Sequence, residues 1–123
     1  MDLIHTCLNV ADADRSVEFY TEQLGFAESW SFETEDGSTT NRYVAAENGV
    51  ELQLSETEGE TDFEQGTAWD HLAVGVEDVD EAFERIDHHG VVQEPADNPA
   101  AGARTAFLKD PDGHVVELVA PLE

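Results

Sequence analysis

Two stretches decide the fold: HTCLNVADADRSVEFY at residues 5–20 and HLAVGVEDVDEAFERI at residues 71–86. Each is a short alternating run followed by a helix-like pattern. Four identities recur between them at a constant offset of 66, with His5, Val10, Asp12 and Asp14 returning as His71, Val76, Asp78 and Asp80. Self-similarity at a fixed offset indicates one structural unit used twice.

The ends of the two halves repeat as well. The tripeptide VEL at 50–52 returns as VEL at 116–118, again after 66 residues. Glu51 and Glu117 therefore occupy the same place in each half. Chance accounts for a shared tripeptide more easily than for His, Asp, Asp and Glu at one offset.

Each half begins with a predicted strand and continues into a predicted helix. With the period of a strand, Ile4, Thr6, Leu8 and Val10 point one way and Leu3, His5, Cys7 and Asn9 the other. Asp14 and Asp80 are the expected helix N-caps. Gly25 and Gly90 follow at the places where the helices would end in the left-handed conformation.

After each helix the sequence is typical of strands separated by turns. Asp-Gly and Asn-Gly pairs at 36–37, 48–49 and 112–113 mark the turns. The predicted order is strand, helix and three strands, twice over, which is an α+β fold of two βαβββ modules. We expect a first module at 1–56, an acidic linker at 57–66 and a second module at 67–123. Modules this small should pair, within one chain or across a dimer.

The charge of the chain is extreme: 29 Asp and Glu stand against 5 Lys and Arg, a formal net charge of −24 in 123 residues. This excludes a nucleic-acid-binding surface, because no basic stripe exists to neutralise phosphates. The acids are spread along the chain rather than gathered in one tail. We interpret them as the surface of a halophilic protein, with an acidic partner-binding surface as the alternative.

The cysteine content and the length of the apolar runs indicate in which cellular compartment the protein is expected. Cys7 is the single cysteine, so no intrachain disulfide is possible and a reducing compartment is expected. The first ten residues contain no basic segment of a signal peptide, and no apolar run approaches 18 residues. The expected location is the cytoplasm.

The last strand of each half predicts a polar face opposite an apolar one. Val50, Leu52 and Leu54 form one row and leave Glu51 on the other side. By the same alternation His5, His71 and Glu117 lie on the faces that carry small and polar residues. Two imidazoles and two carboxylates form a mixed nitrogen and oxygen ligand set for a divalent metal. A structural His or an exposed Glu is the alternative for any one of them taken alone.

HTCLNVADADRSVEFYTEQLGF, VELQL, GTAWDHLAVGVED and FLKDPDGHVVEL resemble the short bacterial glyoxalase I enzymes of the vicinal oxygen chelate superfamily. The resemblance runs from His5 to Leu118. It implies paired βαβββ modules whose sheets form open, incompletely closed barrels. It also implies a metal held by His5, Glu51, His71 and Glu117, with Ni²⁺ preferred and Co²⁺, Mn²⁺ or Zn²⁺ as alternatives.

The activity that this resemblance implies is a carbon–sulfur lyase reaction used in methylglyoxal detoxification. The hemithioacetal of methylglyoxal and a thiol would be isomerised to an S-lactoyl thioester through a metal-bound enediolate. Glu117 would be the principal base, and Glu51 a ligand and second base. The resemblance further implies a homodimer with its sites at the subunit interface.

Other members of the superfamily define the alternatives. Methylmalonyl-CoA epimerases carry Gln in place of Glu51, and fosfomycin-modifying and extradiol-cleaving relatives use two His and one Glu. Bleomycin-binding relatives lack the ligands. An epimerase-like enzyme and a non-catalytic metabolite- or antibiotic-binding protein therefore stay open.

Four further residues are candidates for substrate binding. Asn9 and Ser55 stand where the short bacterial enzymes have Arg and Asn for holding glutathione, so the identity of the thiol is open. Arg42 and Arg104 are cations that would neutralise a carboxylate of the thiol. The alternative for both is an ion pair with the surrounding acids.

Overall fold

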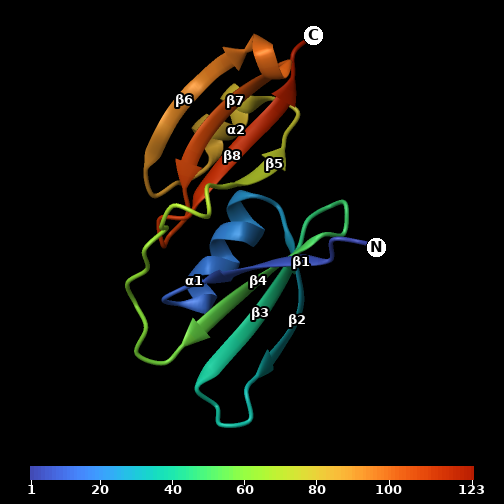
Figure 1. Ribbon diagram of the computed structural model, residues 1–123. Helices are drawn as coiled ribbons and strands as arrows, with labels where there is room; N and C mark the ends of the chain where they lie inside the picture. Colours follow the sequence, from blue (N-terminus) through green and yellow to red (C-terminus); the bar gives the residue numbers. More distant parts are fainter. The chain divides into compact units, whose positions relative to one another are not determined.

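The computed structural model describes residues 1–123, and the chain forms two compact units, Met1–Glu64 and Gln65–Glu123. Each unit contains one copy of the sequence repeat (Figure 1). No helix of the chain has the length and apolar character needed to cross a membrane.

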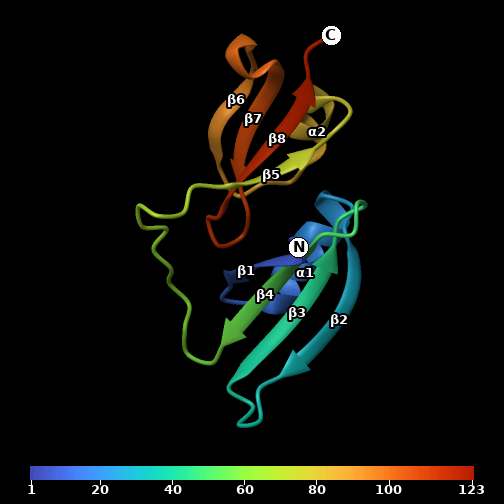
Figure 2. The same cartoon turned by 45° about the vertical axis from the view of Figure 1, so that its right-hand side comes forward.

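The first unit is a four-stranded sheet with one helix against it (Figure 2). The parallel pair β1–β4 continues into antiparallel β3 and β2, giving the order β1-β4-β3-β2. Its elements are β1 (His5–Asn9), α1 (Ala13–Glu18), the π-helical turn η1 (Phe19–Gln23), β2 (Ala27–Glu33), β3 (Thr39–Ala45) and β4 (Glu51–Thr57).

The second unit repeats this topology with the order β5-β8-β7-β6. Its first strand again pairs in parallel with its last. Its elements are β5 (Leu72–Gly75), α2 (Val79–Arg85), β6 (Val91–Asn98), the 3₁₀ turn η2 (Pro99–Ala101), β7 (Ala103–Lys109) and β8 (Val115–Pro121). The α+β class and the two βαβββ modules with open sheets are confirmed.

The core of each unit lies between its helix and one face of its sheet. Alternation along the strands puts branched apolar residues on that face, where they lose contact with water. Leu54, Leu108, Val116 and Leu118 are completely buried, as are Val10 and Tyr20. The opposite face of each sheet keeps the polar and aromatic side chains.

The helix starts differ from the prediction. Asp12 and Asp78, not Asp14 and Asp80, are the N-caps, with extended backbone and side chains that accept from the amides of Arg15 and Glu81. The repeat places two aspartates near each helix start, and the sequence alone does not separate them. Asp14 and Asp80 instead lie in the first helical turn.

The helix ends agree with the prediction in one unit only. Gly25 has φ +74° directly after Leu24, which ends the π-helical turn. Helix α2 already ends at Arg85, so Gly90 lies in the loop before β6 and is not a helix terminus. A Cβ on Gly90 would come within 3.2 Å of Lys109 Cδ, so this glycine makes room for a side chain of β7.

Candidate functional site: a His–Glu pair on each sheet

His5 and Glu51 are neighbours on the open face of the first sheet. They are register partners in the parallel pair β1–β4, and both are partly buried. The ring of Tyr43 meets His5 edge to face, with 5.6 Å between centroids. Register thus brings together two residues that lie 46 positions apart in the sequence.

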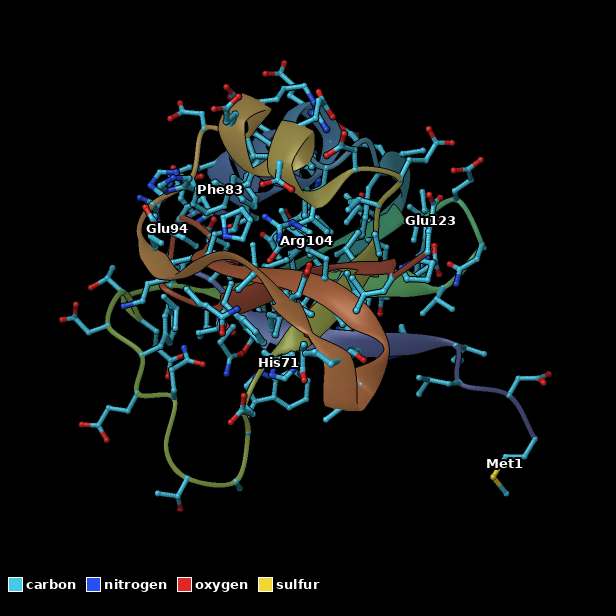
Figure 3. The ribbon with its side chains drawn as sticks, turned by 90° about the horizontal axis from the view of Figure 1, so that it is seen from above. Met1, His71, Phe83, Glu94, Arg104 and Glu123 are labelled. Carbon is cyan, nitrogen blue, oxygen red and sulfur yellow. The ribbon has the colours of Figure 1, made fainter.

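His71 and Glu117 are the counterpart pair in the second unit, and their side chains are in direct contact. His71 Nε2 lies 2.9 Å from Glu117 Oε1. The ring of Phe107 meets His71 edge to face at 5.1 Å. Seen from above, His71 lies on the side of the sheet that faces away from α2 (Figure 3).

Asp70 is a site residue that the sequence analysis missed. Its Oδ1 lies 2.6 Å from His71 Nδ1, so it fixes the ring and leaves Nε2 directed at Glu117. The hydrogen bond that His71 donates to the Asp70 carboxylate raises the pKa of His71 above its ordinary value. Burial lowers this pKa, and the nearby Glu117 carboxylate raises it further. An acidic residue directly before a candidate ligand histidine is a signal that the sequence did offer.

An aromatic cluster borders the His5–Glu51 pair. Trp30 stacks on Tyr43 at 4.2 Å, and Phe32 stacks on Trp30 at 5.5 Å. Trp30 and Phe32 remain 52% and 40% exposed, whereas Tyr43 is 5% exposed. The alternation of β2 and β3 therefore gives this face a broad apolar border rather than a sealed core.

Asn9 and Ser55 lie side by side at the far end of the same face. They are register partners in β1–β4, two steps beyond Cys7 and Gln53 from the His5–Glu51 end. A shallow, open polar depression of about 350 Å³ lies beside Asn9 and is lined on its other side by residues 59–63. The first unit thus has open space next to one candidate for substrate binding.

Arg42 and Arg104 lie on the helix side of their sheets. Arg42 Nη1 forms an ion pair with Asp14 of α1, and Arg104 binds Asp80 of α2 through Nε and Nη2, at 2.6 and 2.8 Å. Figure 3 places Arg104 between the sheet and α2, away from His71. The sequence analysis gave an ion pair with surrounding acids as the alternative to substrate binding for both arginines. The structure contains such ion pairs.

The donor atoms suit a divalent metal. Each unit supplies one imidazole and one carboxylate, and the His71–Glu117 contact shows that such a pair can direct its nitrogen and oxygen at one point. The structure contains no group of three or more His, Cys, Asp or Glu side chains placed to hold a metal ion.

A family model described as the Glyoxalase/Bleomycin resistance protein/Dioxygenase superfamily matches residues 2–118. The chain is 34% identical over 125 residues to the lactoylglutathione lyase of Escherichia coli O157:H7, covering 97% of this chain and 92% of the relative. The enzyme of the same name from Haemophilus influenzae is 33% identical over 124 residues, with 97% and 92% covered.

Solved structures agree with these relatives. The trypanothione-dependent glyoxalase I of Leishmania major matches with a TM-score of 0.79 and 33% identity, over 97% of this chain and 86% of that one. Glyoxalase I from Zea mays matches with a TM-score of 0.85 and 27% identity over 98% of this chain. This chain spans 45% of the length of the maize chain.

Proposed function

The chain belongs to the glyoxalase/bleomycin resistance protein/dioxygenase superfamily and is a glyoxalase I-like lyase, and from this premise we propose its reaction. The substrate is the hemithioacetal of methylglyoxal and a small thiol, and the product is an S-lactoyl thioester. The observation that carries the proposal is the recurrence of one His–Glu pair on the open face of each sheet.

His5, Glu51, His71 and Glu117 would hold one divalent metal, with Ni²⁺ first and Co²⁺, Mn²⁺ or Zn²⁺ as alternatives. When bound, the metal supplies a Lewis acid that makes the C–H next to a carbonyl acidic. The family and the donor chemistry support this ligand set. Asp70 supports it too, since its carboxylate, 2.6 Å from His71 Nδ1, orients the ring so that Nε2 would bind the metal in place of its proton.

Glu117 is the principal base in this proposal. Its carboxylate removes the proton from the carbon that carries sulfur and returns it to the neighbouring carbon, so no redox cofactor is needed. The side chain is 17% exposed, which limits exchange of that proton with water. Glu51 serves as a ligand and as a second base.

The proposed assembly is a homodimer. Each site would take one His–Glu pair from one protomer and the other pair from its partner, which gives two sites per dimer. Sedimentation in high salt is the test. A monomer with full metal occupancy would contradict the dimer and would leave the ligand set standing.

One assay tests the function itself. The protein is loaded with Ni²⁺ or Co²⁺ and mixed with methylglyoxal and a panel of thiols, and the absorbance of the thioester is followed. Catalysed thioester formation is the expected result. Metal and hemithioacetal binding without turnover would instead favour the non-catalytic binding protein, and exchange of an α-proton without thioester formation would favour an epimerase-like enzyme.

A further inference from the structure

The two units differ in the side chains that surround their His–Glu pairs. The first unit carries polar groups on this face at positions where the second unit carries small or apolar ones. By strand register the counterparts are Cys7 and Ala73, Asn9 and Gly75, Gln53 and Val119, Ser55 and Pro121, and Asn41 and Ala103. The pairs are symmetric, but the surfaces beside them are not.

Gln53 is at the centre of the polar surface. Its register partners are Cys7 on β1 and Tyr43 on β3. Along β4 it lies two residues from Glu51 and two from Ser55, so all three side chains point to the same face. Two residues of a strand span about 7 Å. Gln53 therefore lies between the proposed metal ligand and the Asn9–Ser55 end of the face.

Asn41 holds the amide of Gln53 in place. Gln53 Nε2 donates to Asn41 Oδ1 at 2.9 Å, and Asn41 is only 4% exposed. A buried amide without partners is costly, so this bond stabilises one orientation of Gln53. A carboxamide has one carbonyl and two N–H donors. Once one donor is engaged by Asn41, Gln53 still has its carbonyl and one N–H.

The groups on this surface suit a neutral ligand. Arg42 lies on the opposite face in its ion pair with Asp14, and no Lys or Arg lies among the polar residues around Gln53. A carbonyl and an N–H side by side match the acceptor and donor of an amide. The shallow polar depression beside Asn9 lies at the end of β1, two residues beyond Cys7, the register partner of Gln53.

We propose that Gln53, positioned by Asn41, selects thiols that carry an amide group by hydrogen bonding to that amide. This inference rests on the proposed function and names the class of its thiol. Gln53 would contact the substrate directly, and Asn41 would act through Gln53. Peptide-like thiols are then preferred over thiols without an amide.

The test compares two uncharged thiols, N-acetylcysteine amide and 2-mercaptoethanol, each as its methylglyoxal hemithioacetal. Gln53→Val introduces the residue that the second unit has at the same position, so the sheet should tolerate it. The KM for the amide-bearing substrate should rise about tenfold, the loss of one neutral hydrogen bond. The kcat, and both constants with 2-mercaptoethanol, should stay within about twofold.

Asn41→Ala should have the same effect as Gln53→Val, whereas Asn41→Asp, which keeps the acceptor oxygen, should restore the wild-type KM. Because Gln53→Val and Asn41→Ala test the same contact independently, the proposal can still be tested if one of them does not fold. Gln93→Leu is the matched control, because Gln93 donates its amide to Thr105 in the second unit at 3.3 Å. It should leave both substrates unchanged.

Equal shifts in KM for both thiols, or an equal effect of Gln93→Leu, would overturn the selection by Gln53 while leaving the lyase activity intact. Absence of thioester from either thiol with the wild-type protein would contradict the proposed function instead. In that case, calorimetry with N-acetylcysteine amide alone still tests Gln53. A tenfold weaker Kd in Gln53→Val would support the amide contact, and an unchanged Kd would end it.

Discussion

Glu117 is the residue on which the proposed proton transfer depends most. Its contact with His71 is a hydrogen bond that a neutral oxygen can also accept, so Glu117→Gln keeps a ligand atom and removes the proton acceptor. Turnover should fall by roughly 10²–10⁴. The affinity for Ni²⁺ should fall less, since His5, Glu51 and His71 are unchanged.

The measurement is kcat at full metal loading for Glu117→Gln beside Glu51→Gln. Near-normal turnover in the first and none in the second would mean that the two glutamates have exchanged roles. Activity in both variants would contradict carboxylate-mediated proton transfer altogether.

At the scale of the element, the first turn of each helix is tied to the third strand of its unit. Arg42–Asp14 and Arg104–Asp80 are register equivalents, because Arg42 pairs with Leu54 and Arg104 with Ala120. Arg104 also contacts Asp97 of β6 at 3.0 Å and so joins three elements. These ion pairs orient each helix on the buried face of its sheet.

Arg104→Met should therefore lower the urea midpoint of unfolding and leave the KM for the hemithioacetal unchanged. The interaction that this variant loses is the bidentate ion pair between Arg104 and Asp80. Asp80→Asn breaks the same ion pair and should also lower the urea midpoint. A rise in KM for carboxylate-bearing thiols, with stability unchanged, would restore Arg104 as a substrate-binding residue.

The turn between β2 and β3 gives a prediction of pH dependence. Asp36 accepts hydrogen bonds from the amide and hydroxyl of Ser38 and from the hydroxyl of Thr34, which lower its pKa from 3.8 to about 2. A carboxylate whose pKa is lower in the folded state contributes stability above pH 3.8, and this is lost as the pH falls through 2.

Carboxyl chemical shifts followed by NMR should give that titration for Asp36. The Ser38 amide should be protected from hydrogen exchange at neutral pH, and Asp36→Ala should remove the protection. An Asp36 midpoint close to 3.8 would mean that the turn does not hold its carboxylate.

The elements also show what the sequence could and could not predict. Strand alternation and the 66-residue offset depend on local pattern, so the modules, the core face and the placement of His5 beside Glu51 could be anticipated. Asp12 was missed as the N-cap because the backbone angles, not the residue type, choose between two aspartates. The partners of Arg42 and Arg104 depend on long-range register, and these two arginines are 62 rather than 66 positions apart.

At the scale of the whole molecule, the net charge of −24 leads us to expect that stability depends on salt. Only five Lys and Arg are present, and Arg42, Arg85 and Arg104 are already engaged in ion pairs. The excess carboxylates therefore repel one another, and the folded chain holds them closer together than the unfolded chain does. Folding should become less favourable as salt is removed.

The range of that repulsion sets the size of the effect. The Debye length is about 30 Å at 0.01 M salt and about 3 Å at 1 M, so repulsion spans a domain of this size at the first concentration and is confined to near neighbours at the second. The thermal midpoint should rise steeply between them with NaCl and KCl alike, because screening depends on ionic strength. A midpoint that does not change over this range would contradict a halophilic surface and would favour the acidic partner-binding surface, whose carboxylates a basic protein would neutralise.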